Sequence, residues 1–276
     1  MAEDRIRIDV DQYGVATVAM IRGSKHNALD QAMFDALRSG ARQLKDDHEV
    51  RAVVLYGEGK SFCAGLDIAS FLDDSSEGID ALLIRERGEL ANNAQRAAYD
   101  WSQVPVPVIA AISGNCFGGG LQIALGADIR IAAPDARLSI MEVKWGLVPD
   151  MAITQTLPPL IGIDTAKELT YTGRIVSGSE AHGLGLVTRT AEDALTAALA
   201  LAHEIAERSP DAIRAAKRLY DETWTGNDRA AALILESALQ RDLFGKPNQI
   251  EAVTAGLVKR APIFADPACS VAQDRE

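Results

Sequence analysis

Cysteine, aromatic residues and long apolar runs are all scarce in this chain of 276 residues. Its three cysteines, Cys63, Cys116 and Cys269, form no CxxC pair, so neither a disulfide framework nor a cysteine metal site is indicated. The histidines have no HExxH or comparable ligand spacing, and we expect no metal. The apolar runs fall short of the ~18 residues that span a bilayer, and the N-terminus lacks the apolar segment of a signal peptide. We therefore expect a cytoplasmic protein with reduced thiols and no membrane partner.

Positive charge is scarce as well. The chain has 28 Lys and Arg residues against 39 Asp and Glu, which gives a net charge of −11. Such an excess of negative charge disfavours attraction to nucleic acid, so we expect no nucleic-acid partner and only local phosphate sites. With 47% hydrophobic and 24% charged residues, the composition is that of an ordinary globular protein of one or two domains.

Strand and helix patterns alternate through the first two thirds of the chain. Alternating or apolar runs predict strands at 5–10, 13–21, 51–57 and 105–113. The first predicted helix begins near a cap at Asn27 or Asp30, and a short second helix begins near Asp67. The acidic segment 73–80 predicts a surface loop, and one continuous helical face is predicted after it at Ile79, Leu83, Leu90, Ala94, Ala97 and Trp101.

From about residue 191 the pattern becomes helical. Apolar residues recur at helical spacing over 211–222, 228–243 and 249–259. We therefore predict an α/β core over residues 1–195 and a C-terminal helical region over residues 196–276 that serves as a lid or an oligomerisation module.

Two glycine-rich turns, at 61–67 and 114–120, each lie between a predicted strand and a predicted helix. Neither is a nucleotide motif, because Val54 stands where a P-loop needs glycine and Ile123 where GxGxxG does. A GxSxG elbow fails at Cys63. The turns do offer backbone N–H groups beside a helix N-terminus, which would suit an oxyanion hole. Two tight turns with a purely structural role are the alternative.

Three segments together resemble the crotonase, or enoyl-CoA hydratase/isomerase, superfamily. They are SFCAGLD at 61–67, AISGNCFGGGLQIALGADIRIA at 111–132 and MEVKWGLVPD at 141–150, with weaker echoes at 185–187 and 257–264. The resemblance implies a crotonase-like spiral of ββα units, an acyl-CoA thioester substrate and no cofactor beyond the coenzyme A of that substrate. It also implies a homotrimer or a hexamer built as a dimer of trimers, and fatty-acid metabolism as the commonest setting.

The resemblance further implies that the amides of Ala64 and Gly119 hold the thioester oxygen. Arg22, Lys25, Lys259 and Arg260 are candidates to neutralise the coenzyme A phosphates. The implied substrate-binding residues are Lys25, Ala28, Ala64, Gly65, Leu66, Asp67, Gly118, Gly119 and Trp145.

The acid/base residues depart from the pattern of the resembled hydratases, which carry two glutamates. Glu142 occupies the second glutamate position, but Gln122 stands at the first, and an amide cannot shuttle a proton. Asp150 stands where a dienoyl-CoA isomerase carries a catalytic aspartate. Three hypotheses follow. The first is hydration or double-bond migration by Glu142, with Gln122 positioning water or substrate. The others are dienoyl-CoA isomerisation by Glu142 and Asp150, and a binding protein without turnover.

Overall fold

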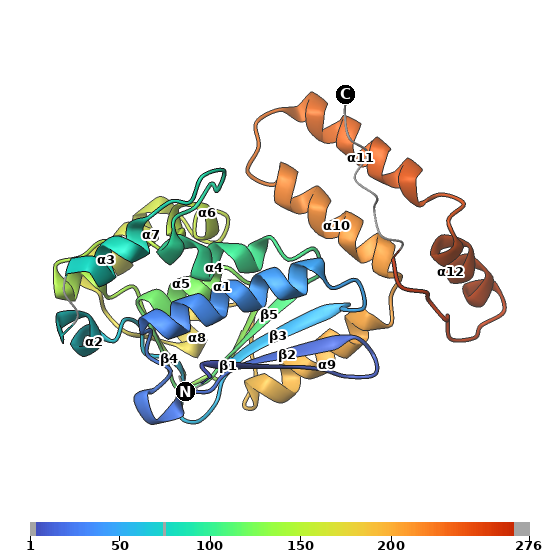
Figure 1. Ribbon diagram of the computed structural model, residues 1–276. Helices are drawn as coiled ribbons and strands as arrows, with labels where there is room; N and C mark the ends of the chain where they lie inside the picture. The colour runs from blue at the N-terminus through green and yellow to red at the C-terminus, as the bar shows by residue number, and fades with distance from the viewer. Residues whose placement is uncertain (1–3, 74–75, 268–276) are drawn as a thin grey trace.

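The computed structural model describes residues 4–73 and 76–267, and its centre is a mostly parallel six-stranded sheet (Figure 1). The strand order is β1-β2-β3-β5-β7-β10, and β1 alone pairs antiparallel, with β2. A four-stranded sheet of order β4-β6-β8-β9 lies beyond it. The strands are β1 (Ile6–Val10), β2 (Val15–Met20), β3 (Ala52–Gly57), β4 (Ser61–Cys63), β5 (Val108–Ile112), β6 (Asn115–Phe117), β7 (Ile129–Ala132), β8 (Arg137–Ser139), β9 (Val176–Ser177) and β10 (Arg189–Thr190).

Helices connect the strands and form the C-terminal part of the chain. The 3-10 helices are η1 (Gly23–Lys25) and η2 (Glu142–Trp145). The α-helices are α1 (Gln31–Asp46), α2 (Ile68–Asp73), α3 (Ser76–Leu83), α4 (Asn93–Ser102), α5 (Gly119–Leu125), α6 (Ile153–Thr156), α7 (Ile163–Thr172), α8 (Gly178–Leu184), α9 (Ala194–Ala206), α10 (Pro210–Thr223), α11 (Arg229–Leu243) and α12 (Pro247–Leu257).

The two faces of the large sheet support separate apolar clusters, because successive strand residues point to opposite faces. In β3, Val53 and Leu55 face the cluster that contains residues of α1, α4 and α5. Ala52 and Val54 face the cluster made with α9. Helix α9 lies on the other side of this sheet from α1 (Figure 1). Helix α9 begins at Ala194, so it crosses the predicted boundary at residue 195, and it covers the sheet. The division into two domains stays a prediction.

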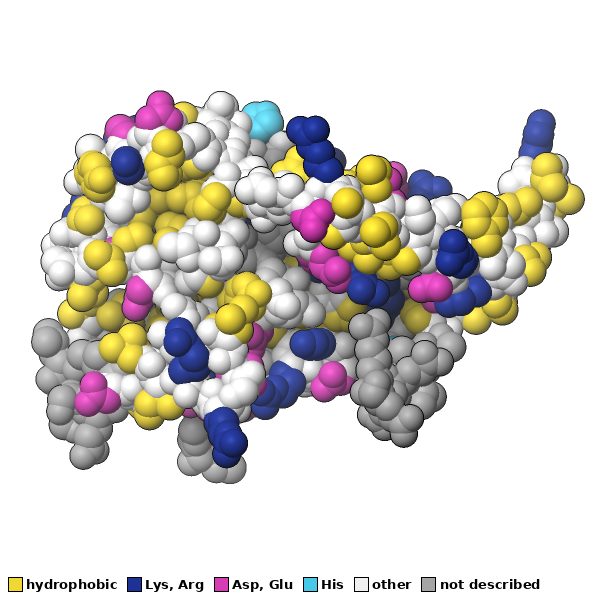
Figure 2. All heavy atoms as spheres, turned by 90° about the horizontal axis from the view of Figure 1, so that it is seen from above, with side chains coloured by type: hydrophobic (Ala, Val, Ile, Leu, Met, Phe, Trp, Pro, Cys, Tyr) yellow, Lys and Arg dark blue, Asp and Glu magenta, His cyan; other side chains and the backbone are white. Residues whose placement is uncertain are grey.

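Helices α10 to α12 project from the body of the molecule (Figure 1). Large apolar side chains are exposed there: Trp224 at 69%, Leu233 at 62%, Phe244 at 67% and Leu257 at 79%. Figure 2 shows hydrophobic side chains along this projecting part. The three helices agree with the predicted helical segments, and such a surface is of the kind that oligomers bury. The homotrimer or hexamer stays a prediction.

The segment around residues 73–102 differs from its prediction. Of the loop predicted over 73–80, residues 76–80 belong to α3 and Asp73 ends α2, while residues 74–75 lie outside the described residues. The predicted continuous helix is interrupted between Leu83 and Asn93, where Leu90 is 78% exposed. A new helix then begins because the side chain of Asn92 caps α4 by accepting from the Gln95 amide.

Candidate functional site

The two glycine-rich turns meet at the small sheet. Strands β4 and β6 are parallel neighbours, and α5 begins directly after β6. Gly65 has a φ of +87°, and a Cβ there would lie 2.7 Å from the Phe117 carbonyl oxygen and 3.7 Å from the Gly119 nitrogen. This close approach requires glycine at position 65, and it sets the first turn beside the start of α5.

Of the two amides that the resemblance implies as donors, Ala64 and Gly119, the first is already hydrogen-bonded. The Ala64 N–H donates to the His26 carbonyl at 2.9 Å, so this amide already has a partner. Bonds from Leu29 N to Gly65 O and from Asp67 N to Leu29 O flank Leu66. Within residues 4–73 and 76–267, no acceptor is found for the Leu66 N–H. The free donor of this turn is therefore at Leu66 and not at Ala64.

Gly119 supplies the second donor. It is the first residue of α5, and amides of a first helical turn have no acceptor inside the helix. The preceding residue, Gly118, adopts φ +53° and donates its own N–H to the Ser139 carbonyl. The Gly119 N–H, with the positive end of the helix behind it, is available to an anionic oxygen.

The Glu142 carboxylate lies beside the start of α5. A Cβ on Gly118 would lie 3.4 Å from Glu142 Oε1, so the carboxylate borders the N-terminus of α5. Glu142 is the first residue of η2 and only 8% exposed. Its Oε1 accepts a hydrogen bond of 2.6 Å from Gln122 Nε2. Its Oε2 is buried and has no hydrogen-bond partner among the described residues, so that oxygen is available to accept a hydrogen bond or a proton.

Gln122 is held at both ends of its amide group. Its Nε2 donates to Glu142, and its Oε1 accepts from the Met151 backbone N–H at 2.7 Å. The side chain is almost wholly buried, with 1% of the residue exposed. Gln122 therefore fixes the orientation of the Glu142 carboxylate and ties it to the loop at Asp150 and Met151.

The carboxyl groups of Glu142 and Asp150 both have pKa values above the usual range. Burial raises the pKa of Glu142, the hydrogen bond from Gln122 opposes that rise, and the negative charge of Asp150 adds to it. Asp150 is an exposed residue, yet the protein packed around its carboxyl group raises its pKa too. A carboxyl group whose pKa is raised toward neutrality is suited to take up and return protons.

Three of the residues predicted to bind the substrate or its phosphates form ion pairs within the protein. Asp67 Oδ2 accepts a 2.7 Å bond from Arg22, which also donates to the Ala28 carbonyl. Arg260 forms an ion pair with Glu251. Arg22 and Arg260 are thus held by carboxylates, while Lys25 is exposed and has no ion pair within the described part of the chain.

The other predicted binding residues, Ala28 and Trp145, differ in burial: the first is buried and the second is exposed. Ala28 is 9% exposed, and its neighbour Leu29 packs by Gly119, where a Cβ would meet Leu29 Cδ1 at 2.8 Å. Trp145 is 60% exposed at the end of η2. Sequence reasoning missed Met151, whose backbone N–H donates to Gln122, and the Leu66 N–H, for which no acceptor is found among the described residues. Both residues contribute a backbone N–H, so the identity of their side chains does not reveal them in the sequence.

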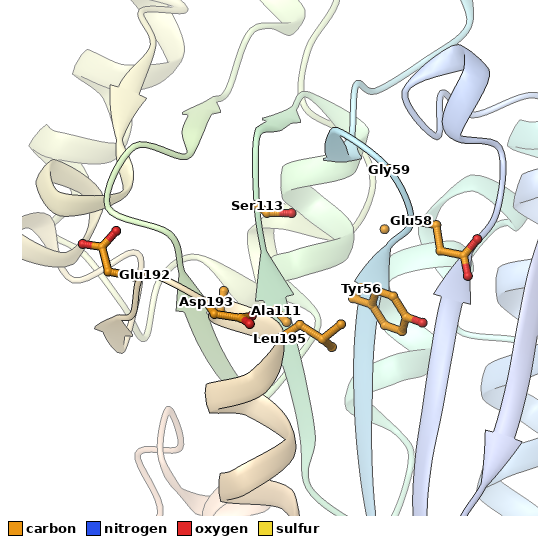
Figure 3. A pocket seen from close by; sticks show the side chains of 10 residues that line it. Tyr56, Glu58, Gly59, Ala111, Ser113, Glu192, Asp193 and Leu195 are labelled. Carbon is orange, nitrogen blue, oxygen red and sulfur yellow. The ribbon is translucent and has the colours of Figure 1, made fainter.

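A cavity of about 330 Å³ lies apart from this site (Figure 3). It opens where β3 and β5 end and α9 begins, and it is lined by Tyr56, Glu58, Ser113, Glu192 and Asp193, among others. Tyr56 packs against the α9 cluster, on the opposite face of the sheet from α5. This cavity therefore is not the space above Glu142.

Comparison with known proteins identifies the family. The family model described as enoyl-CoA hydratase/isomerase matches residues 11–267. The chain belongs to the enoyl-CoA hydratase/isomerase family. It is 36% identical to the "Probable enoyl-CoA hydratase" of Bacillus subtilis (strain 168) over 94% of this chain and 98% of that protein. It is 31% identical to the human "Methylglutaconyl-CoA hydratase, mitochondrial", over 95% of this chain and 78% of that protein.

Solved structures of the family share the fold. The enoyl-CoA hydratase of Bacillus anthracis superimposes with a TM-score of 0.86 at 31% identity, over 94% of this chain and 98% of that one. The predicted crotonase-like α/β fold is therefore confirmed, and the chain is an enzyme of the hydratase/isomerase type. No helix in the described part of the chain is long and apolar enough to cross a membrane.

Proposed function

We propose that this family member acts on an enoyl-CoA thioester and uses Glu142 as its single acid/base group for double-bond migration. The observation that carries the proposal is the 2.6 Å contact between Gln122 and Glu142. It puts an amide where a second carboxylate would complete a two-glutamate site, and it leaves one carboxylate oxygen free. Coenzyme A enters as part of the substrate, and the proposed reaction uses no metal.

The reaction runs through an enolate. The thioester oxygen accepts hydrogen bonds from the Leu66 and Gly119 amides, and Glu142 Oε2 removes a proton from Cα of a 3-enoyl-CoA. The electron pair of the broken C–H bond shifts toward the thioester oxygen, where the two N–H groups stabilise the negative charge more than they stabilise the neutral carbonyl. Glu142 then returns the proton to Cγ, and the double bond moves between Cα and Cβ.

The proposal is tested by incubation in deuterated water with crotonyl-CoA, a 3-enoyl-CoA and a 3,5-dienoyl-CoA. We expect the 3-enoyl-CoA to isomerise without an increase in mass from added water. Addition of water to crotonyl-CoA as the faster reaction would overturn the preference for migration. Coenzyme A binding by calorimetry with no turnover of any of the three would favour the binding-protein hypothesis.

Hydration is the second candidate, because the relatives from Bacillus subtilis and human are named hydratases. Gln122→Glu supplies the missing carboxyl group in contact with Glu142. We expect crotonyl-CoA hydration to rise by roughly tenfold or more, since a positioned acid or base contributes ~10²-fold or more. The control is Gln155→Glu, which adds the same charge at an exposed residue of α6. Equal hydration rates in both variants would contradict the role given to Gln122.

Asp150 is tested by Asp150→Asn. Removing its charge removes a contribution that raises the pKa of Glu142, so the pKa of Glu142 falls. Because the base must be ionised, we expect the acid limb of the kcat/KM profile to move to lower pH. Asp164→Asn, at an exposed residue of α7, should leave the profile unchanged. Selective loss of 3,5-dienoyl-CoA turnover would instead support the dienoyl-CoA isomerase hypothesis.

A further inference from the structure

A second cavity, between α1 and α4, is lined by arginine. Its volume is about 320 Å³, within the range of small-molecule sites. Three guanidinium groups reach it from two helices, together with one carboxylate and two neutral polar side chains. The lining residues are Arg38, Ser39, Arg42, Gln43, Glu86 and Arg96, which we call the arginine cavity.

The guanidinium groups of the arginine cavity are only partly satisfied. Arg96 has a side chain that is 6% exposed, and its Nη1 lies 3.6 Å from Glu86 and 3.5 Å from Glu89. These separations exceed the usual hydrogen-bond distance. Arg38 donates to Asp35 and to the side-chain oxygen of Asn93, but its buried Nε has no hydrogen-bond partner in the described part of the chain. Arg42 contacts only Glu89 among the described carboxylates, at 3.3 Å.

The carboxylates around the arginine cavity fall into two groups. Asp35 accepts from Arg38 at 2.7 Å, and Asp100 accepts from Arg96 at 3.0 Å, so both are firmly held. Glu86 and Glu89 come from the connection between α3 and α4 and are 52% and 36% exposed. Their longer contacts with arginine are of a kind that contributes little to stability. An incoming anion can therefore displace these two glutamates at small cost.

The chemistry of the donors selects the anion. Guanidinium forks bind phosphate oxygens in pairs, and three forks arriving from two helices suit a ligand that presents oxygens in several directions. Asp35 pairs with Arg38 and Asp100 with Arg96, so once Glu86 and Glu89 turn outward the third guanidinium has no paired carboxylate among the described residues and the local charge is positive. The Ser39 hydroxyl and the Gln43 amide add neutral donors to the lining.

We propose that the arginine cavity binds a phosphate-type oxyanion, either inorganic phosphate or the phosphate group of a small monoester. Arg38, Arg42 and Arg96 hold the oxyanion, and Glu86 competes with it. The cavity is built from residues other than those around Glu142 and the two amide donors, so binding there is independent of acyl-CoA binding.

Calorimetry on the full-length protein tests this, with sodium phosphate, glycerol phosphate and succinate compared at matched ionic strength up to about 20 mM. We expect binding of phosphate or of the monoester, retained in the presence of saturating coenzyme A; the tighter of the two identifies the source of the phosphate group. Tighter binding of succinate, or loss of phosphate binding with coenzyme A, would overturn the proposal.

Two variants locate the site. Arg42→Gln should weaken phosphate binding by about tenfold, the effect of losing a charged hydrogen-bond partner. Arg42 has a 60% exposed side chain, so the substitution should not disturb folding. The control, Arg218→Gln in α10, removes the same charge from a side chain that is 58% exposed. Glu86→Gln should tighten binding by removing the competing carboxylate. Equal phosphate affinity in the Arg42 and Arg218 variants would refute the assignment.

Discussion

Glu142→Gln is expected to lower kcat for the preferred enoyl-CoA by roughly 10³-fold, because it removes the group that carries the proton. The fold should survive this change. A glutamine oxygen can still accept the 2.6 Å hydrogen bond from Gln122, and the substitution introduces no new charge into the buried site. Steady-state kinetics with a 3-enoyl-CoA measures the loss, and calorimetry with coenzyme A should show unchanged binding.

Stability provides a second readout of the same variant. Because burial raises the pKa of Glu142 in the folded state, its contribution to stability is present at low pH and is lost as pH rises through the raised pKa. At neutral pH the neutral glutamine should therefore be at least as stable as wild type in urea unfolding. Glu236→Gln, at an exposed residue of α11, is the matched control and should change neither activity nor stability. Retention of kcat in Glu142→Gln would exclude Glu142 as the base.

The fold follows from sequence patterns where the determining interactions are local. Asp30 accepts a hydrogen bond from the Met33 amide three residues ahead, so the start of α1 could be predicted from its cap. The continuous apolar run of β3 likewise reflects a strand that is buried on both faces of the sheet. The break between α3 and α4 was missed because spacing alone connected Leu83 to Leu90. In the structure, Asn92 starts a new helix with its own cap.

The candidate site could be predicted only in part, because several of its interactions join distant backbone atoms. Ala64 and Leu66 stand two positions apart in one motif, and only the contact with the His26 carbonyl distinguishes their amides. Asp67 was equally suited to cap a helix or to touch ligand, and Arg22, 45 positions earlier, engages it instead. The motif did identify Gln122 as a departure. The anchoring of its amide by Met151 required the three-dimensional structure.

Gly65→Ala is expected to lower kcat/KM by roughly 10²-fold or more, the usual effect of losing one oxyanion donor. A Cβ at this position would lie 2.7 Å from the Phe117 carbonyl oxygen, and backbone at this distance must move. Phe117 immediately precedes Gly118 and Gly119, so the displacement separates the two amide donors that the proposed reaction needs.

The backbone cost of this substitution can be separated from its effect on the site. Gly65 has a φ of +87° and Gly88 a φ of +90°, but nothing lies within 4 Å of a Cβ at Gly88. Both alanine variants therefore carry a conformational penalty of about 1–3 kcal/mol, and only Gly65→Ala meets the Phe117 carbonyl. Urea unfolding of Gly88→Ala measures the shared penalty, the further loss of stability in Gly65→Ala measures the clash, and kinetics on the folded proteins measures the effect on the site. If Gly65→Ala were as active as Gly88→Ala, contact between the two turns would not be what aligns the Leu66 and Gly119 amides.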